Sequence, residues 1–363
     1  MFFLLVTFCD LCYTVLVKGG IFLDWEKLKQ EPYPIVLYGM GNGADRVLDS
    51  LAQHGLHAAG VFASDEFVRG QSFRGFPVLT YRQACERFGK MLVLLSFGTR
   101  LPEVLGRIER LSREQTLLCP DFPVAGTQLF TEEFFSRNAG RFSSVRALLA
   151  DAQSRLVFDN TVQYKLSWDI RPLRACESSP DEAYTSILRL EPGEALADLG
   201  AYRGDTVADF VRFCPDYSEI SAFEPDAYSY RHLLQNTASL PRCTCYALAV
   251  SDSDAPIAFS SRGGRGSGAG GETLCPADTV DHVLAGRRVS FLNIDVEGGE
   301  RAAIAGAAEL IRTQKPKLLV AAYHRSEDLF ALCEQVLSLR PDYRVFLRHF
   351  PQLPAWETNF YFV

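Results

Sequence analysis

The chain has 363 residues, of which 47% are hydrophobic and 22% are charged, and its formal net charge is −7. This length exceeds what a single hydrophobic core usually serves, so two domains are expected in an otherwise ordinary globular composition. The net negative charge and the lack of clustered Lys and Arg exclude a nucleic acid as partner, because a phosphate backbone is bound by such clusters.

The first seventeen residues are apolar, but Asp10 interrupts the run and no basic residues precede it. The run is also shorter than the ~20 residues that a membrane-crossing helix needs. We therefore expect an N-terminal helical segment over residues 1–29, packed on the protein, with no firm membrane anchor. Peripheral membrane contact and an artefact of start-site choice are the alternatives. A cytoplasmic location is the default expectation, and the ten cysteines, which form no regular framework, fit a reducing compartment.

A small Rossmann-like α/β domain is predicted over residues 30–125. Apolar, β-branched runs alternate there with segments of helical spacing, which is the pattern of a parallel sheet. The expected strands are residues 34–38, 58–62 and 91–96, and the expected helices are residues 45–54 and 81–88.

The turn after the first strand contains Gly39, Gly41 and Ala44 in the spacing G-x-G-x-x-A. Such a turn can bring backbone N–H groups close to a phosphate, and an acidic residue after the next strand can accept ribose hydroxyls. The second, nucleotide-binding candidate site therefore comprises Gly39, Gly41, Asn42, Gly43 and Asp65.

This domain resembles the N-terminal domain of bacterial sugar N-acyltransferases, which implies a nucleotide-sugar as its ligand. A module used only for docking or oligomer contacts is the alternative, because one glycine-rich turn is a weak pattern. A nicotinamide-dependent, sugar-modifying enzyme that uses this turn is a further alternative. The apolar residues between Thr131 and Trp168 recur at helical intervals, so residues 126–176 are expected to form a helical connector that could roof the second domain's site.

Three motifs lie between Leu196 and Glu300 in the order that an S-adenosylmethionine-binding fold requires. The first runs from Asp198 to Thr206 and predicts a strand, a tight turn and a helix. Gly200 and Gly204 let the backbone pass close to a ligand, while the helix that begins near Asp205 and Thr206 offers free N–H groups to a carboxylate. Asp198 could hold the ligand's ammonium group directly or through water.

The other two motifs end further strands of the same sheet. Glu224 follows the second strand at about one βαβ unit from the first, where a carboxylate can accept both hydroxyls of a ribose. The third motif, from Phe291 to Glu300, ends its strand at Asp295. Ligands of open α/β sheets bind at this carboxyl edge.

From residue 177 to the C-terminus the sequence resembles the FkbM-type methyltransferases. The resemblance rests on the three motifs, on Ala249-Val250-Ser251-Asp252, on the run from Pro316 to His324 and on the end from Glu357 to Val363. It implies a methyltransferase domain over residues 177–363, whose cofactor site also includes Tyr202 and Asp252. Asn293 stands where this family usually has Lys, which leaves substrate choice in doubt.

Methyl transfer to a hydroxyl needs a general base near the methyl group. Asp295 and His324 each follow a predicted parallel strand, so both are candidate catalytic residues. A hydrogen-bonded structural role is the alternative for His324, and capping of the next helix is the expected role of Glu297 and Glu300. No metal site is predicted, because Asp295 and Glu297 alone supply too few oxygen ligands for a hard cation.

The sequence thus predicts an α/β protein with a class I methyltransferase Rossmann-like sheet in its C-terminal half and a smaller Rossmann-like domain before it. The expected function is S-adenosylmethionine-dependent methyl transfer, with O-methylation of a sugar or other polar metabolite as its form. A non-catalytic nucleotide-sugar-binding or assembly module built on the same fold is the alternative. The expected partner is a small molecule such as a sugar or nucleotide-sugar, and a homo-oligomer is a further expectation.

Overall fold

The structure, a computed structural model, describes residues 23–260, 268–269 and 273–363. Most of the predicted N-terminal helical segment, residues 1–22, lies outside these ranges. The described part of that segment includes Trp25, whose ring packs 4.8 Å from the ring of Trp168, and the start of the 3-10 helix η1 (Lys27–Gln30). Within the described ranges, every helix is too short or too polar to traverse a lipid bilayer.

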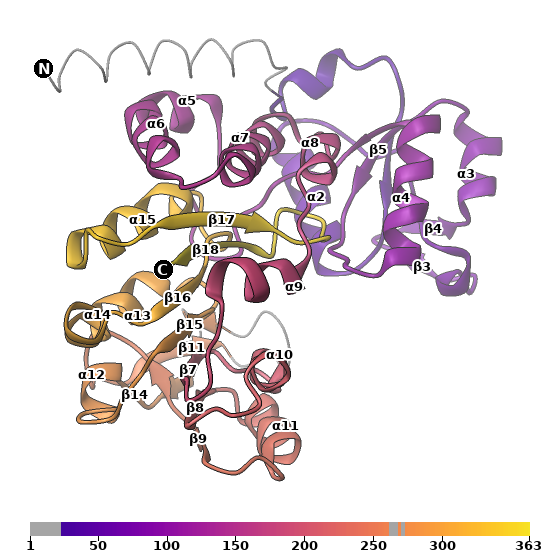
Figure 1. The fold of residues 1–363 in the computed structure, drawn as a ribbon. Coiled ribbons are helices and arrows are strands. Elements are labelled where there is room, and N and C mark those ends of the chain that lie inside the picture. Colours follow the sequence, from indigo (N-terminus) through magenta and orange to yellow (C-terminus); the bar gives the residue numbers. More distant parts are fainter. Residues whose placement is uncertain (1–22, 261–267, 270–272) are drawn as a thin grey trace, which may run out of the picture.

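The first of the two large sheets has six strands in the order β3-β4-β2-β1-β5-β6 (Figure 1). All of its pairs are parallel except β3 with β4. The strands are β1 (Ile35–Tyr38), β2 (Gly60–Phe62), β3 (Ser72–Phe73), β4 (Phe76–Leu79), β5 (Leu92–Leu95) and β6 (Thr116–Leu118). The accompanying helices are α2 (Asn42–Gln53), the 3-10 helix η2 (Asp65–Phe67), α3 (Tyr81–Phe88) and α4 (Pro102–Glu114).

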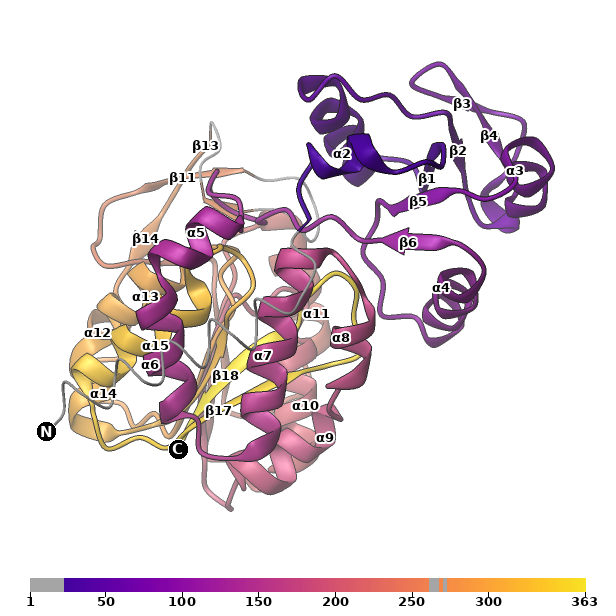
Figure 2. The same ribbon diagram turned by 90° about the horizontal axis from the view of Figure 1, so that it is seen from above.

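Four helices connect this sheet to the second one: α5 (Glu132–Arg137), α6 (Ala139–Leu148), α7 (Ala152–Ser167) and α8 (Arg171–Ala175). Helix α7 is shared between the cores of both sheets, since Phe158 packs in the C-terminal core and Tyr164 in the N-terminal one. Both side chains are fully buried. In Figure 2 the two sheets form separate bodies, with α7 and α8 beside the C-terminal one.

The second sheet has seven strands in the order β17-β18-β16-β15-β7-β8-β9. Its strands are β7 (Ala195–Leu199), β8 (Glu219–Phe223), β9 (Cys243–Tyr246), β15 (Phe291–Ile294), β16 (Lys317–Ala321), β17 (Val345–His349) and β18 (Thr358–Phe362). Five strands are parallel, and β18 runs antiparallel to both of its neighbours, β16 and β17. The chain therefore ends in an antiparallel hairpin of β17 and β18.

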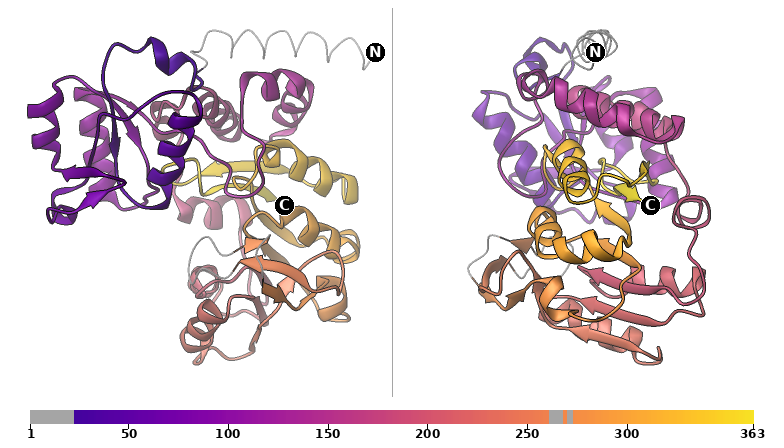
Figure 3. Two further views of the ribbon diagram at one scale, coloured as in Figure 1. Left: turned by 180° about the vertical axis from the view of Figure 1, so that it is seen from behind. Right: turned by 60° about the vertical axis from the view of Figure 1, so that its left-hand side comes forward.

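Successive side chains of a strand point to opposite faces of the sheet, and both faces of this sheet are buried. Leu292, Ile294 and Val320 pack with α13 (Glu300–Gly306), α14 (Ala308–Gln314), α15 (Asp328–Leu339) and the connector helices. Phe291 and Leu319 face the opposite side, where α10 (Asp205–Phe213) and the π-helix η3 (Ala183–Leu188) pack. Figure 3 shows this layering from behind and from the side.

Smaller elements complete the C-terminal half. The helices are α9 (Pro180–Glu182), α11 (Ala227–Thr237) and α12 (Val280–Val283). The strands are β10 (Ala249–Val250), β11 (Ile257–Ser260), β12 (Gly268–Ala269), β13 (Thr273–Cys275) and β14 (Ala277–Asp278). A short break separates helices α13 and α14. The break falls at Gly306 and Ala307, where a side chain on Gly306 would meet the Ser251 carbonyl oxygen at 1.9 Å.

Candidate active site

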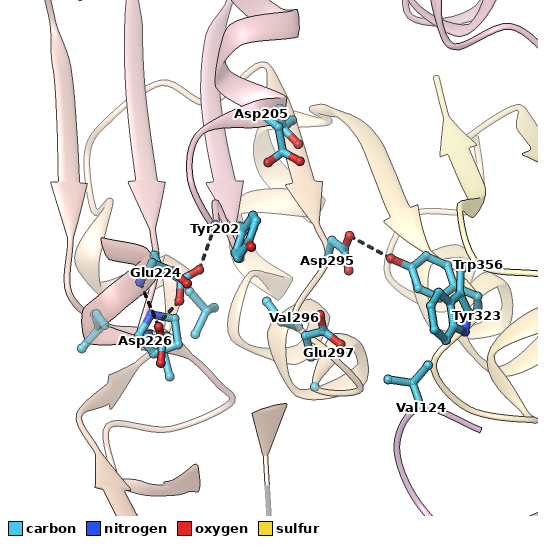
Figure 4. A pocket seen from close by; sticks show the side chains of 18 of the residues that line it. Val124, Tyr202, Asp205, Glu224, Asp226, Asp295, Val296, Glu297, Tyr323 and Trp356 are labelled. Carbon is cyan, nitrogen blue, oxygen red and sulfur yellow. Dashed lines mark hydrogen bonds between the residues drawn. The ribbon is translucent and has the colours of Figure 1, made fainter. Parts of the chain in front are cut away.

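A cleft of about 300 Å³ lies at the carboxyl edge of the C-terminal sheet (Figure 4). One side of it is formed by the ends of β7 and β8 and the first turn of α10, with Gly200, Thr206 and Glu224. The other side is formed by the ends of β15 and β16, with Asp295 and Tyr323. The three sequence motifs therefore meet at one edge, as expected for parallel strands that end together.

The turn after β7 is held against the end of β15. Gly200 has φ +84°, and a Cβ at this position would lie 1.8 Å from the carbonyl oxygen of Asp295. Only glycine fits this position, because the backbone is left-handed and the neighbouring strand fills the side-chain space. Gly204, at φ +89°, precedes the first residue of α10 and packs against Leu233.

Glu224 is fixed at the end of β8 by two backbone donors. The N–H of Tyr202 donates to its Oε2 at 2.8 Å and the N–H of Asp226 donates to its Oε1 at 2.7 Å. Burial raises the pKa of Glu224 to about 7, although both hydrogen bonds act in the opposite direction. Each carboxylate oxygen can accept a further hydrogen bond, so this side chain can still receive a ligand's hydroxyl groups.

Asp198 lies below the cleft instead of lining it. Its side chain is fully buried, and its Oδ1 accepts a 2.7 Å hydrogen bond from the amide of Asn293 on β15. Burial raises the pKa of Asp198 to about 7, against the lowering effect of that hydrogen bond. Asn293 is 2% exposed, so its side chain serves Asp198 and does not line the cleft.

Asp295 faces the cleft from the end of β15. Its side chain is 37% exposed, and the hydroxyl of Tyr323 donates to its Oδ2 at 3.0 Å (Figure 4). Desolvation raises the pKa of this carboxyl above its ordinary value. A carboxylate with a raised pKa and access to the cleft is suited to accept a proton.

His324 follows β16 but is buried, with 1% of its side chain exposed. Its Nδ1 lies 2.9 Å from Glu300 Oε1, and its Nε2 lies 3.5 Å from both Asp295 Oδ1 and Glu297 Oε2. Burial alone would lower the pKa of the ring, but the three carboxylates outweigh it and raise the pKa to about 10. A ring whose pKa is raised in this way is poorly suited to accept a proton, so the role of His324 as general base stays a prediction.

The roof and the far wall of the cleft come from segments that the sequence motifs did not include. Val124 enters from the segment after β6, and Gln352 and Trp356 enter from the loop between β17 and β18. The same loop pairs with the N-terminal half, because Thr99 and Leu353 exchange backbone hydrogen bonds of 2.8 and 3.0 Å. Both halves of the chain thus shape one cleft.

The predicted cofactor-binding and catalytic residues divide into two groups. Six predicted residues line the cleft: Gly200, Tyr202, Asp205, Thr206, Glu224 and Asp295. Four do not: Asp198, Gly204, Asp252 and His324. Asp252 is exposed beyond β10, and the cleft is lined there by Leu248, Ala249 and Val250 instead. Ala249 and Val250 belong to the motif Ala249-Val250-Ser251-Asp252, but Asp252 was the residue predicted from it.

The glycine-rich turn after β1 has the geometry of a tight strand-to-helix turn, with φ +116° at Gly39 and +106° at Gly41. A Cβ on Gly39 would lie 2.5 Å from the ring of Phe97, and one on Gly43 would lie 2.1 Å from the carbonyl oxygen of Ser96. Packing within the chain accounts for these two glycines. Asn42 is the first residue of α2 and Asp65 is exposed at the start of η2. Nucleotide binding at this turn stays a prediction.

A family model matches part of the C-terminal half, and a solved structure resembles the whole chain in fold. Residues 198–349 match the family model of the methyltransferase FkbM domain. The crystal structure of methyltransferase FkbM from Methylobacillus flagellatus KT superposes with a TM-score of 0.75 and 20% identity, covering 99% of this chain and 100% of that one. An rRNA methylase from Streptococcus thermophilus has 14% identity and a TM-score of 0.31, covering 48% of this chain and 87% of that one. No curated protein sequence matches this chain.

The strand order and the antiparallel β18 give the C-terminal half a class I methyltransferase Rossmann-like fold, with the cleft at the carboxyl edge of its sheet. The match of residues 198–349 to the model of the methyltransferase FkbM domain agrees with the resemblance seen in the sequence.

Proposed function

We propose that this protein is an S-adenosylmethionine-dependent O-methyltransferase whose acceptor is a sugar or another polar metabolite. The observation that supports this most directly is the division of one cleft into two chemically different sides. Gly200, Thr206 and Glu224 stand on the β7–β8 side, while Asp295 and two aromatic rings, Tyr323 and Trp356, stand on the other.

The residues on the β7–β8 side fit the cofactor. The nearly buried carboxylate of Glu224 can accept ribose hydroxyls, and the first turn of α10, which includes Asp205 and Thr206, offers backbone N–H groups. Apolar residues Leu248 and Val250 can cover an adenine ring. When bound, S-adenosylmethionine supplies an electrophilic methyl group attached to a sulfonium.

The other side fits an acceptor. Aromatic faces such as those of Tyr323 and Trp356 can pack against the apolar face of a sugar ring, while Asp295 accepts the proton of the hydroxyl that attacks. An S-adenosylmethionine molecule bound on the β7–β8 side would supply the methyl group, which its carbon–sulfur bond holds. Because the transfer is an in-line displacement, most of the rate enhancement comes from holding the hydroxyl in line with that bond.

Two measurements test this proposal. Calorimetry should detect binding of S-adenosylmethionine or S-adenosylhomocysteine, and a panel of sugars and nucleotide-sugars should include one that triggers release of S-adenosylhomocysteine. Asp295→Asn should lower that release by about 10²- to 10⁴-fold while cofactor affinity changes little. No binding of either ligand at millimolar concentration would overturn the proposal. Binding without release by any acceptor would favour a non-catalytic binding module.

A further inference from the structure

A groove of about 690 Å³ adjoins the cleft at the turn where β7 leads into α10. Tyr202 and Asp205 line both hollows, and Figure 4 shows them on the side of the cleft. The other walls of the groove come from α10, from the end of α11 and from Arg100 in the N-terminal half. We call it the arginine groove, because Arg203 lines it together with Arg100. A ligand in this groove would lie next to a ligand in the cleft.

The guanidinium of Arg203 is held by two aromatic rings. Its Cζ lies 5.0 Å from the ring centroid of Tyr202 and 5.3 Å from that of Tyr228. The ring faces stabilise the positive charge, but they supply no oxygen acceptor for the N–H groups of the guanidinium. Its Nε is buried and has no hydrogen-bond partner among the described residues. A buried donor without a partner costs free energy, which favours a ligand that brings oxygen acceptors.

The turn that carries Arg203 is fixed on both sides. Before it, the N–H of Tyr202 donates to Glu224, and Tyr202 has a left-handed φ of +49°, which residues other than glycine rarely adopt. The amide of Asn236 on α11 donates a 2.8 Å hydrogen bond to the carbonyl oxygen of Arg203. Backbone strain of this kind persists where the surrounding structure holds it, and it recurs at ligand sites. The backbone of Arg203 is thus held in place before a ligand binds.

Arg100 brings a second guanidinium from the other half of the chain. Its side chain is exposed, and it follows Thr99, whose backbone exchanges hydrogen bonds of 2.8 and 3.0 Å with Leu353. That pairing fixes the segment of Arg100 against the C-terminal half. Among the described residues neither Arg100 nor Arg203 forms an ion pair, and the single acidic residue that lines the groove is Asp205. The groove therefore carries an excess of positive charge in a chain whose net charge is −7.

These features suit the phosphate group of an organic molecule. The planar fork of a guanidinium matches two oxygens of a phosphate, and such charge-assisted hydrogen bonds are stronger than neutral ones. Four apolar residues also line the groove: Val207, Ala208, Val211 and Leu240. An inorganic ion would leave this wall exposed to water, whereas the carbon skeleton of a phosphate ester can cover it. The volume of the groove lies in the range of small-molecule sites.

We propose that the arginine groove binds the phosphate of a small-molecule phosphate ester, and that this ester is the methyl acceptor. Arg203 and Arg100 hold the phosphate, while the rest of the molecule extends past Tyr202 into the cleft. The assignment as acceptor rests on the proposed function, whereas the phosphate site rests on the groove alone. A phosphate ester that is not methylated and the carboxylate of the cofactor are the competing ligands.

Binding is tested by calorimetric titration of the full chain with inorganic phosphate, glucose 1-phosphate and uridine diphosphate. At least one of the two organic probes should bind below millimolar concentration and more tightly than inorganic phosphate. Arg203→Gln and Arg100→Gln should each weaken that binding about tenfold or more, because each removes a charge-assisted contact. Arg231→Gln is the matched control and should keep the affinity within about twofold. The Cζ of Arg231 lies 5.9 Å from the same Tyr228 ring, but this residue does not line the groove.

Four results would overturn the site. They are no binding of either organic probe at millimolar concentration, binding of inorganic phosphate as tight as that of both organic probes, and equal affinity in wild type and Arg100→Gln. The fourth is a loss of S-adenosylmethionine affinity in Arg203→Gln as large as its loss of probe affinity, which would assign the groove to the cofactor's carboxylate. Arg100 is exposed, so its variant remains informative if Arg203→Gln does not fold.

Methyl transfer separates this proposal from the proposed function. A phosphorylated acceptor should have a lower KM than its unphosphorylated counterpart, and Arg100→Gln should raise that KM about tenfold with little change in kcat. Equal KM values for the phosphorylated acceptor in wild type and Arg100→Gln would reject the groove as an acceptor site and keep the methyltransferase. Binding of an organic probe by a protein that binds no S-adenosylmethionine would keep the phosphate site and reject that function.

Discussion

Asn293 on β15 lies directly opposite Asp198 on β7, and its amide donates a 2.7 Å hydrogen bond to the Asp198 carboxylate. The resemblance to FkbM-type enzymes left Asn293 as a possible determinant of substrate choice. The structure gives it a different partner, because both side chains are buried beneath the cleft. An amide can satisfy one oxygen of Asp198 but brings no positive charge, and Oδ2 has no hydrogen-bond partner among the described residues.

The burial of Asp198 beside Asn293 predicts that the protein becomes less stable as the pH rises. The pKa of Asp198 is about 7 in the folded chain and about 3.9 when unfolded, so the folded state binds the proton more tightly between these values. The free energy of unfolding should therefore fall as pH rises from about 4 to about 7. Asp198→Asn removes this titration and should recover up to about 4 kcal/mol at pH 8 relative to pH 4.

Urea unfolding of the ligand-free protein at several pH values measures this difference. Other buried carboxyls titrate in both proteins, so their effects cancel when the two pH profiles are subtracted. The exposed carboxylate of Asp216, replaced in Asp216→Asn, provides a control that should keep the wild-type profile. Parallel profiles for wild type and Asp198→Asn would contradict the raised pKa.

Gly200 offers a test of the contact between β7 and β15. Gly200→Ala should destabilise the protein by about 2 kcal/mol or more beyond the strain of a left-handed residue, because its Cβ would overlap the Asp295 carbonyl oxygen. Gly193→Ala is the matched control. Gly193 has φ +86°, close to the +84° of Gly200, but no atom lies within 4 Å of its added Cβ.

Both substitutions add the strain of a left-handed alanine, but only Gly200→Ala adds a steric overlap. The difference between their losses of unfolding free energy therefore measures the cost of that overlap. We expect Gly200→Ala also to lose cofactor binding, since the displaced turn carries Tyr202 and leads into α10. Similar destabilisation by both substitutions would show that β15 yields at this point and that backbone conformation alone requires glycine.

Glu224 and Asp252 were both predicted to contact the cofactor, and substitutions at the two positions should now have different effects on its affinity. Glu224→Ala should weaken S-adenosylmethionine binding by about 1–3 kcal/mol, because a buried acceptor is lost and the N–H groups of Tyr202 and Asp226 are left unpaired. Asp252→Asn should leave the affinity unchanged, since this exposed residue does not line the cleft. Calorimetric titrations of both variants, with their folding checked by circular dichroism, decide between the two assignments.

The sequence was most informative where an apolar run ends in a glycine or a carboxylate. Such an ending predicts a strand and also which edge of the sheet its last side chain reaches, so Gly200, Glu224 and Asp295 could be assigned to one cleft. The order of the strands was not predicted from the sequence and comes from the structure.

The surroundings of each side chain could not be predicted in the same way. His324 follows its strand as expected, yet its protonation depends on Glu300 and Glu297, which reach it from another strand's turn. Val124 and Trp356 contact the cleft through tertiary packing alone. No local periodicity identifies a residue whose role depends on a neighbour more than a hundred positions away.

The contact between Gly98 and Trp356 allows the energetic coupling between the two halves of the chain to be measured. A Cβ on Gly98, in the N-terminal half, would lie 2.3 Å from the Trp356 ring that lines the cleft. Gly98→Ala should therefore destabilise the protein by about 1–3 kcal/mol in the wild-type background, through overpacking. In the Trp356→Ala background the ring is gone, so the same substitution should cost little.

A double-mutant cycle from urea unfolding gives the coupling between the two residues, expected at about 1–2 kcal/mol. Gly106→Ala is the control within the same half, because Gly106 lies inside helix α4 with no atom within 4 Å of an added Cβ. That substitution should be neutral or stabilise by up to about 1 kcal/mol in both backgrounds. If Gly98→Ala costs the same with and without the tryptophan, the ring moves aside freely, and the N-terminal half does not fix this wall of the cleft.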